Sequence, residues 1–233
     1  QIRLVRKLRV RLSDSELDRL MAQAIQDSRD LLATLGYFAP DIMLERGTPL
    51  PDGTRTLTLR VAPGEATLIT GLDIVLTGLI LQDPAARAQM ALIQDTWLLR
   101  PGMRFSQDRW AAAKQQALRQ LTTAGYPTGR LAASTADIDP LQHSARLRVV
   151  LDSGPAHYLG GLVISGLARY DTELVTRLAR MQPGSRYAQT DLVAAQQRLA
   201  DSGYFDSAYV WLNTAGDPAA APVMVELGEG KLK

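Results

Sequence analysis

The chain has 233 residues, of which 46% are hydrophobic and 21% charged, a composition that can bury a core and is unlike that of a disordered protein. Lys and Arg outnumber Asp and Glu by only 26 to 24, which gives no electrostatic indication of a nucleic-acid partner. The chain has no cysteine, which excludes disulfides, thiol catalysis and thiolate zinc sites, and no apolar stretch reaches the roughly 20 residues of a membrane helix.

The first predicted helix covers residues 12–36. Ser13 and Glu16 have the spacing of a capping box, which marks a helix N-terminus. Two strand-like runs, residues 41–46 and 55–62, follow around the turn-rich segment "GTPLPDGT". Only twelve residues precede Ser13, too few for a strand and a full helix, so we expect this first repeat to be incomplete at its N-terminus.

The next two segments repeat this order and place a strand and a further helix before it. The expected strands, 67–76 and 157–166, are apolar runs entered through glycine turns. Helices then begin near Asp83 and Asp171, and each is expected to stop at a Pro-Gly pair. The second helices and the hairpin strands follow, at 106–124, 129–137 and 145–152 in one segment and at 190–202, 207–213 and 223–227 in the other.

A Gly-Tyr pair ends the last helix of each segment. We expect the glycine to take the left-handed position that terminates a helix, and the tyrosine to pack where the hairpin leaves. The pairs begin at Gly36, Gly125 and Gly203. The sequence therefore predicts an α+β protein of three tandem domains, each a three-stranded mixed sheet covered on one face by two helices. Their predicted limits are 1–63, 64–153 and 154–233.

This repeat resembles the POTRA domain, the periplasmic repeat of outer-membrane barrel proteins of the BamA and TamA superfamily. The residues that carry the resemblance are the helix-to-hairpin run "PGSRYAQTDLVAAQQRLADSGYFDSAYV", residues 183–210, and its counterpart in residues 101–131. The resemblance implies that the chain is the periplasmic portion of a longer outer-membrane protein, whose own C-terminal membrane barrel is absent from this chain. It also implies a role in assembling or translocating outer-membrane proteins such as autotransporters.

No catalytic constellation accompanies the repeats. His143 and His157 have no His, Asp or Glu at metal-ligand spacing, so packed or solvated histidines are the expectation. "GGLVISG" from Gly160 begins a strand and does not open a helix, so it is not a phosphate loop. We therefore expect neither an enzyme nor a bound cofactor or metal.

The expected activity is recognition of polypeptide backbone. In the predicted topology the first hairpin strand is an edge, which presents unpaired N–H and C=O groups to an extended chain. The candidate residues are Ile42, Met43, Leu44 and Glu45 in the first copy, Arg130, Leu131 and Ala132 in the second, and Tyr209, Val210, Trp211 and Leu212 in the third. The resemblance implies two kinds of partner: unfolded outer-membrane proteins, and a TamB-like inner-membrane-anchored protein that we expect at the first edge.

Several alternatives are open at this stage. Each edge strand could equally be solvated or covered by a neighbouring domain instead of binding a partner. The edge strand of the third copy could also be buried under the adjoining barrel. The string of domains can also be a passive spacer between a barrel and an inner-membrane partner. Finally, the same repeats occur in BamA-like proteins, in two-partner secretion transporters, and in division or secretion proteins that have a membrane helix.

Overall fold

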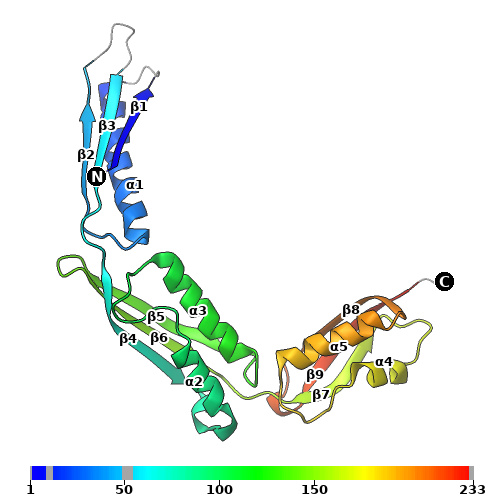
Figure 1. Cartoon of the computed structure of the whole chain (residues 1–233). Coiled ribbons are helices and arrows are strands. Elements are labelled where there is room, and N and C mark those ends of the chain that lie inside the picture. The colour runs from blue at the N-terminus through cyan, green and yellow to red at the C-terminus, as the bar shows by residue number, and fades with distance from the viewer. Residues whose placement is uncertain (1, 9–12, 49–54, 231–233) are drawn as a thin grey trace. The chain divides into compact units, whose positions relative to one another are not determined.

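The computed structural model describes residues 2–8, 13–48 and 55–230 (Figure 1). By the density of their contacts these residues form two compact units. Unit 1 runs to Asp73 and adds Leu98–Ala113 and Thr135–Arg148, and unit 2 comprises Ile74–Trp97, Lys114–Ser134 and the chain from Val149 onward. The boundary between the units passes through the second predicted repeat, so the predicted domain limits stay a prediction. We keep the term repeat for the three segments.

The first repeat is a three-stranded sheet with one helix. Its elements are β1 (Ile2–Leu8), α1 (Asp14–Thr34), β2 (Asp41–Arg46) and β3 (Arg55–Ala62). The strand order is β1-β3-β2, and both neighbours of β3 run antiparallel to it. The prediction of a mixed sheet is therefore wrong for this repeat.

The number of helices between the first strand and the hairpin explains the difference. One helix separates β1 from β2, whereas two helices separate the corresponding strands of the third repeat. Each helix takes the chain across the sheet once, so one helix fewer reverses the direction of the first strand. The prediction that this repeat lacks part of its N-terminal structure is correct for the helix and wrong for the strand, because residues 2–8 form β1.

The start of α1 confirms the predicted capping box. The Ser13 backbone N–H donates to the Glu16 carboxylate at 2.9 Å, and the Glu16 N–H donates to the Ser13 hydroxyl at 3.3 Å. These two bonds satisfy donors that a helix N-terminus otherwise leaves unpaired. The pKa of Glu16 is lowered, first by the Ser13 backbone N–H and then by the Ser13 hydroxyl, which donates to the same carboxylate at 2.7 Å.

The second repeat adds the predicted extra strand and helix. Its elements are β4 (Leu68–Thr77), the 3-10 turns η1 (Leu79–Gln82) and η2 (Pro84–Ala86), α2 (Arg87–Asp95), α3 (Gln107–Thr122), β5 (Arg130–Asp139) and β6 (Ser144–Asp152). The strand order is β4-β6-β5. The predicted apolar stripe of the second helix is confirmed, because Trp110, Ala113, Ala117 and Leu121 are all buried. Alternate residues of β6, Ala145 to Leu151, are buried as well, as the alternating sequence predicts.

The third repeat has the predicted mixed sheet. Its elements are β7 (Leu159–Ser165), α4 (Thr172–Ala179), α5 (Gln189–Asp201), β8 (Phe205–Leu212), η3 (Pro218–Ala220) and β9 (Ala221–Glu229). Strand β9 is central, with β7 parallel and β8 antiparallel to it. Helices α4 and α5 lie on one face of this sheet (Figure 1). The core between them includes Val175, Leu199, Val223 and Val225, each at most 1% exposed.

Two helices end earlier than predicted. Helix α2 stops at Asp95, well before Pro101, because the apolar residues Trp97 and Leu99 are buried in an irregular connection. Helix α4 stops at Ala179, where Arg180 takes the left-handed conformation at φ 51°. The Pro-Gly pairs thus lie beyond the helix ends. None of the helices that the structure describes is long and apolar enough to span a membrane.

The repeated Gly-Tyr pairs have the predicted backbone. Gly36, Gly125 and Gly203 have φ values of 90°, 75° and 76°, which favour glycine over any residue with a Cβ. Each glycine therefore ends its helix in the left-handed region, as predicted. The tyrosines differ in their surroundings, since Tyr126 is completely buried and Tyr204 is 40% exposed.

Candidate polypeptide-binding edges

The strand orders place β2, β5 and β8 at sheet edges. All of the residues predicted as candidates lie on these three strands, in the positions that the sequence analysis gave them. Each sheet has a second edge as well, formed by β1, β4 or β7. What an edge strand offers to a partner depends on which of its backbone groups point away from the sheet.

On β2 the outward backbone groups are those of Ile42 and Leu44. The N–H of Gly47 donates to the Thr56 carbonyl at 2.7 Å, which fixes the phase of the antiparallel ladder. Hydrogen-bonded pairs alternate along such a ladder, so the backbones of Met43 and Glu45 face β3 and those of the even-numbered residues face outward. The side chains of β2 alternate between the core and the solvent. Ile42 is buried, whereas Met43 and Glu45 are exposed.

A salt bridge holds one charged candidate residue on each of the first two edges. The Glu45 carboxylate lies 3.3 Å from the Arg60 guanidinium on β3. On β5, Arg130 pairs with Asp152 at 3.0 Å, while Leu131 is half-buried and Ala132 is exposed. The pKa of Asp152 is lowered, first by the Gly154 N–H and then by Arg130. These charges are therefore tied to their own sheets.

On β8 the outward backbone groups are those of Ala208, Val210 and Leu212. The N–H of Asn213 donates to the Pro222 carbonyl at 2.9 Å, so the odd-numbered residues bond to β9. One of the outward donors is already occupied, because the Val210 N–H donates to the side-chain oxygen of Gln196 on α5 at 3.1 Å. Helix α5 thus covers part of this edge.

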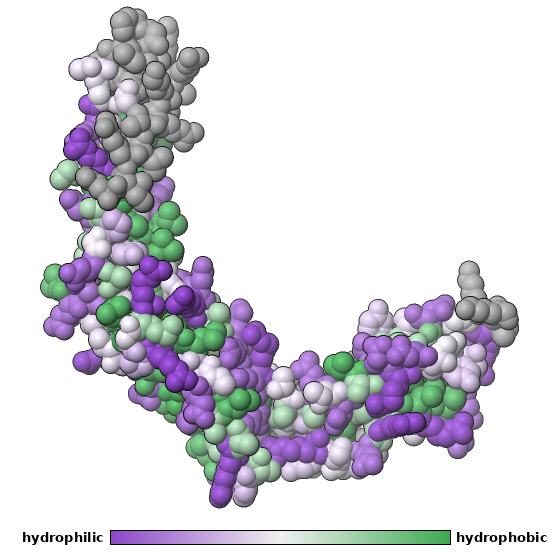
Figure 2. Space-filling model, viewed as in Figure 1, coloured by the Kyte–Doolittle hydropathy of each residue, from purple (hydrophilic) through white to green (hydrophobic). Residues whose placement is uncertain are grey.

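The side chains of β8 give the third edge its apolar surface. Tyr209 is 59% exposed and Trp211 is 43% exposed, while Val210 and Leu212 pack against the core. Leu212 is partly buried in the core of its own repeat, and the alternative of burial under an adjoining barrel stays a prediction. On the face in view in Figure 2, the apolar residues of the described chain are interspersed with hydrophilic ones.

A shallow groove next to β4 was not predicted. It has a volume of about 530 Å³, and Arg87 and Gln94 contribute polar groups to it. Its apolar lining comes from the second half of β4, from η1 and from α2, namely Ile74, Val75, Leu76, Leu81, Met90 and Ala91. The sequence contains a signal for it, the run "GLILQ" directly after the strand, because Leu79 and Leu81 are exposed apolar residues. Side chains of a polypeptide that pairs with β4 would have this groove beside them.

No chemistry beyond recognition is evident in the part of the chain that the structure describes. That part contains no cluster of three or more His, Asp or Glu side chains able to hold a metal ion. His143 lies 3.9 Å from the Glu65 carboxylate, and His157 is buried with its Nδ1 atom 3.1 Å from the Pro155 carbonyl oxygen. The expectation that the protein is not an enzyme stays a prediction.

Comparison with known proteins gives the class of the third repeat and the fold of the chain. Residues 157–216 match the POTRA family model, described as the surface antigen variable number repeat, so the third repeat is of POTRA type. The chain is similar to the structure of POTRA3–5 of Haemophilus influenzae BamA, with a TM-score of 0.54, 17% sequence identity, and coverage of 97% of this chain and 98% of that chain.

BamA from Haemophilus ducreyi lacking POTRA domains 1–3 also has a TM-score of 0.54 to this chain, at 14% identity. The match covers 70% of this chain and 29% of that one. At these identities the similarity establishes the fold, an α+β arrangement of sheets and helices of the POTRA type. Function has to be argued from the edges themselves.

Proposed function

We propose that this chain is the periplasmic POTRA region of an outer-membrane protein assembly or translocation factor, and that it binds extended polypeptides by strand addition. The observation that carries the proposal is the set of edge strands β2, β5 and β8, which end three small sheets. Backbone pairing depends little on the partner's side chains, which suits a protein that handles many unfolded barrel chains. The POTRA match of residues 157–216 and the similarity to BamA POTRA3–5 support the same assignment.

Within this class we propose TamA as the nearest counterpart. Three repeats in series, the run "AIQDSRDLLATLGYFAPDI" in the first, and a longer last helix in the second than in the third support this choice. The partner at β2 would then be a TamB-like inner-membrane-anchored protein. A BamA-like protein, a two-partner secretion transporter, or a division or secretion protein with a membrane helix is the competing assignment. The full-length gene separates the last of these from the others, because a division or secretion protein would encode a membrane helix in place of a barrel.

Strand addition can be tested by titrating the isotope-labelled chain with an unfolded peptide from an outer-membrane barrel strand. We expect NMR shift changes confined to β2, β5 or β8, with Val210 and its neighbours among them. Replacing Gln196 with Ala frees the Val210 N–H for the peptide. One added hydrogen bond of ordinary strength should tighten binding about threefold to tenfold at this edge.

The matched control is Gln197→Ala on the same helix. The Gln197 side chain bonds to Asp201 and not to β8, so its removal should leave the affinity unchanged. Shift changes that avoid all three edges, or a Gln196→Ala variant that binds like the control, would argue against strand addition at β8.

A passive spacer is the second candidate, and the connections between repeats favour it. The Gly36 carbonyl accepts the Thr67 N–H at 2.8 Å, and the Gly125 carbonyl accepts the His157 N–H at 2.7 Å. Such bonds fix each connection within its own unit. The same titration separates the two functions, because a spacer predicts a folded chain with no shift changes at millimolar peptide.

A further inference from the structure

The chain contains two joints of the same design, each between a Gly-Tyr pair and the repeat that follows it. In the first joint, within unit 1, Thr67 donates its N–H to Gly36 and accepts the Phe105 N–H at 2.9 Å. In the second, within unit 2, His157 donates its N–H to Gly125 and accepts the Tyr187 N–H at 2.9 Å. The backbone pattern is therefore the same in both places.

An arginine followed by an aromatic residue completes each joint. The two segments read "PGMRF", ending in Arg104 and Phe105, and "PGSRY", ending in Arg186 and Tyr187. The guanidinium carbon of Arg104 lies 5.6 Å from the centroid of the Tyr37 ring, and that of Arg186 lies 5.2 Å from the centroid of the Tyr126 ring. Both distances allow cation–π attraction. The first half of a joint thus contributes a tyrosine ring, and the second half contributes an arginine.

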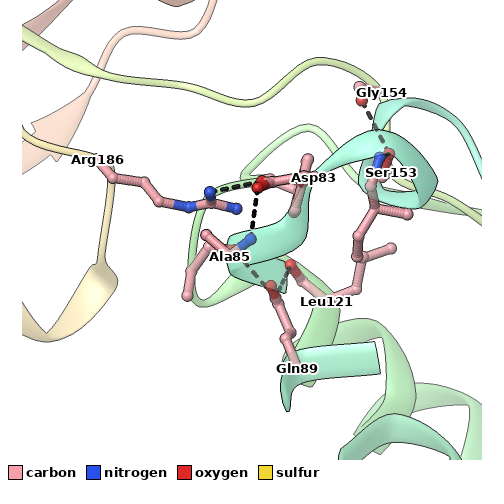
Figure 3. A network of polar contacts seen from close by, with 10 residues as sticks. Asp83, Ala85, Gln89, Leu121, Ser153, Gly154 and Arg186 are labelled. Carbon is pink, nitrogen blue, oxygen red and sulfur yellow. Dashed lines mark hydrogen bonds and ion pairs between the residues drawn. The ribbon is translucent and has the colours of Figure 1, made fainter. Parts of the chain in front are cut away.

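Hydrogen bonds fix the arginine in both cases. Arg104 donates to the Tyr37 hydroxyl at 3.1 Å. Arg186 pairs with the Asp83 carboxylate at 2.5 Å (Figure 3). The same carboxylate oxygen accepts the Tyr126 hydroxyl at 2.7 Å. The Asp83 carboxylate also accepts the Ala85 N–H at 2.9 Å, so it begins η2 as well.

The third Gly-Tyr pair has the same backbone conformation. In the part of the chain that the structure describes, no counterpart of the segments "PGMRF" and "PGSRY" packs against it. Among the residues that the structure describes, nothing lies within 4 Å of a Cβ placed at Gly203, whereas a Cβ at Gly36 or Gly125 would meet the Phe105 carbonyl or the Arg186 guanidinium. No hydrogen bond to the Gly203 carbonyl comes from the residues that the structure describes. Tyr204 packs its ring edge-on against Tyr170, with centroids 5.2 Å apart, and keeps 40% of its surface exposed.

The third repeat also has a carboxylate at the place of Asp83. Asp171 begins α4 and accepts the Glu173 N–H at 3.0 Å, as Asp83 accepts the Ala85 N–H. The arginine close to it in the sequence, Arg169, is held elsewhere, because it pairs with Glu229 at 2.9 Å and lies over the Tyr170 ring. A carboxylate, a tyrosine ring and a left-handed glycine are therefore present at the positions that hold an arginine in the second joint.

We propose that Gly203, Tyr204 and Asp171 form a docking surface for a neighbouring polypeptide that presents an arginine followed by an aromatic residue. The two completed joints identify this occupant, since both use that dipeptide. The surface differs from the outward backbone of β8, so the proposal does not depend on strand addition.

The test is an NMR titration of the isotope-labelled full chain with the end-blocked peptide MQPGSRYAQ, the sequence of residues 181–189. We expect saturable shift changes at Gly203, Tyr204 and Asp171, with a dissociation constant in the millimolar range. The same peptide with Ala in place of its Arg should bind about fivefold more weakly, or more weakly still. The first two joints should not respond, because their own segments occupy them at high effective concentration.

A variant of the chain tests the carboxylate without removing the helix cap. Asp171→Asn keeps a good N-cap residue and removes the charge, so it should weaken the Arg peptide and leave the Ala peptide unchanged. Equal binding of the two peptides, or a folded chain whose shifts do not change, would overturn the proposal. Shift changes confined to β8 would overturn it too, while supporting strand addition.

Discussion

A glycine with the same left-handed backbone ends the last helix of every repeat, yet the three glycines have different neighbours. Gly203 has no close neighbour among the described residues, whereas Gly36 lies against the backbone carbonyl of Phe105. A positive φ favours glycine at all three positions. Only inside a completed joint does the close approach of another segment also exclude a Cβ. A substitution can separate the two reasons.

Gly203→Ala should lower the free energy of unfolding by about 1 kcal/mol, because alanine is strained at φ 76°. Gly36→Ala should cost more, about 2 kcal/mol or above, because the added methyl group also displaces the Phe105 backbone. Urea denaturation of the two variants measures both losses. Gly216→Ala is the control, since Gly216 has open space and no positive φ, and it should be nearly neutral. Equal losses at Gly36 and Gly203 would contradict this account of the joint.

At the scale of elements, a single carboxylate fixes the connection from β7 to α4. Glu229, at the end of β9, accepts the backbone N–H groups of Ala168 and Arg169 at 2.8 Å and of Tyr170 at 3.1 Å. These bonds and the Arg169 guanidinium lower the pKa of Glu229 to about 2, the Arg169 N–H being the largest cause. The carboxylate therefore stabilises the folded state only while it is ionised.

The bonds of the Glu229 carboxylate, which we call the Glu229 clamp, predict a specific pH dependence. Because the folded-state pKa is depressed, the stabilisation is fully present above the ordinary value of 4.5 and is lost as the pH falls toward 2. The stability of the parent chain should fall more steeply over that window than that of Glu229→Gln, and the two curves should approach each other at low pH. Urea unfolding at a series of pH values measures this, with Glu226→Gln as the charge-matched control. A stability difference that does not change with pH would rule the clamp out.

Local pattern was sufficient to predict most elements and the edge positions. The alternation in β6 and β9 and the stripe on α3 each identify one buried face, and the order strand, helix, strand, strand places β2, β5 and β8 at edges. The direction of β1 was not predicted, because residues 2–8 were not recognised as a strand and the effect of one missing helix on strand direction was not considered. The role of "PGMRF" and "PGSRY" was missed because these segments were interpreted as helix breakers. Their contacts are with residues far away in the sequence, and no local pattern encodes such contacts.

At the scale of the whole molecule, the second joint connects two consecutive repeats within unit 2. In unit 2 the Gly125 N–H donates to the Tyr187 carbonyl at 2.8 Å, and the Gln189 N–H donates to the Thr123 carbonyl at 2.8 Å. These bonds connect the end of α3 directly to the start of α5. The Asp83–Arg186 pair adjoins them, and both of its side chains are mostly shielded, at 20% and 26% exposure. The pair is therefore positioned to keep the joint closed.

Breaking this pair should open the joint without unfolding the third repeat. In Arg186→Ala we expect the amides of Gly125 and Gln189 to exchange their hydrogens faster, while the amides of β9 keep their protection, because the core of the repeat lies elsewhere. A double-mutant cycle with Asp83→Asn should give a coupling energy of about 1–2 kcal/mol, the range of a charge-assisted bond that is partly shielded from water. Arg177→Ala, on α4, is the control for loss of a positive charge. If the Gly125 amide exchanges at the same rate in Arg186→Ala and in the control, the pair does not hold the joint. The main evidence that the proposed partner at Gly203 needs an arginine would then be lost.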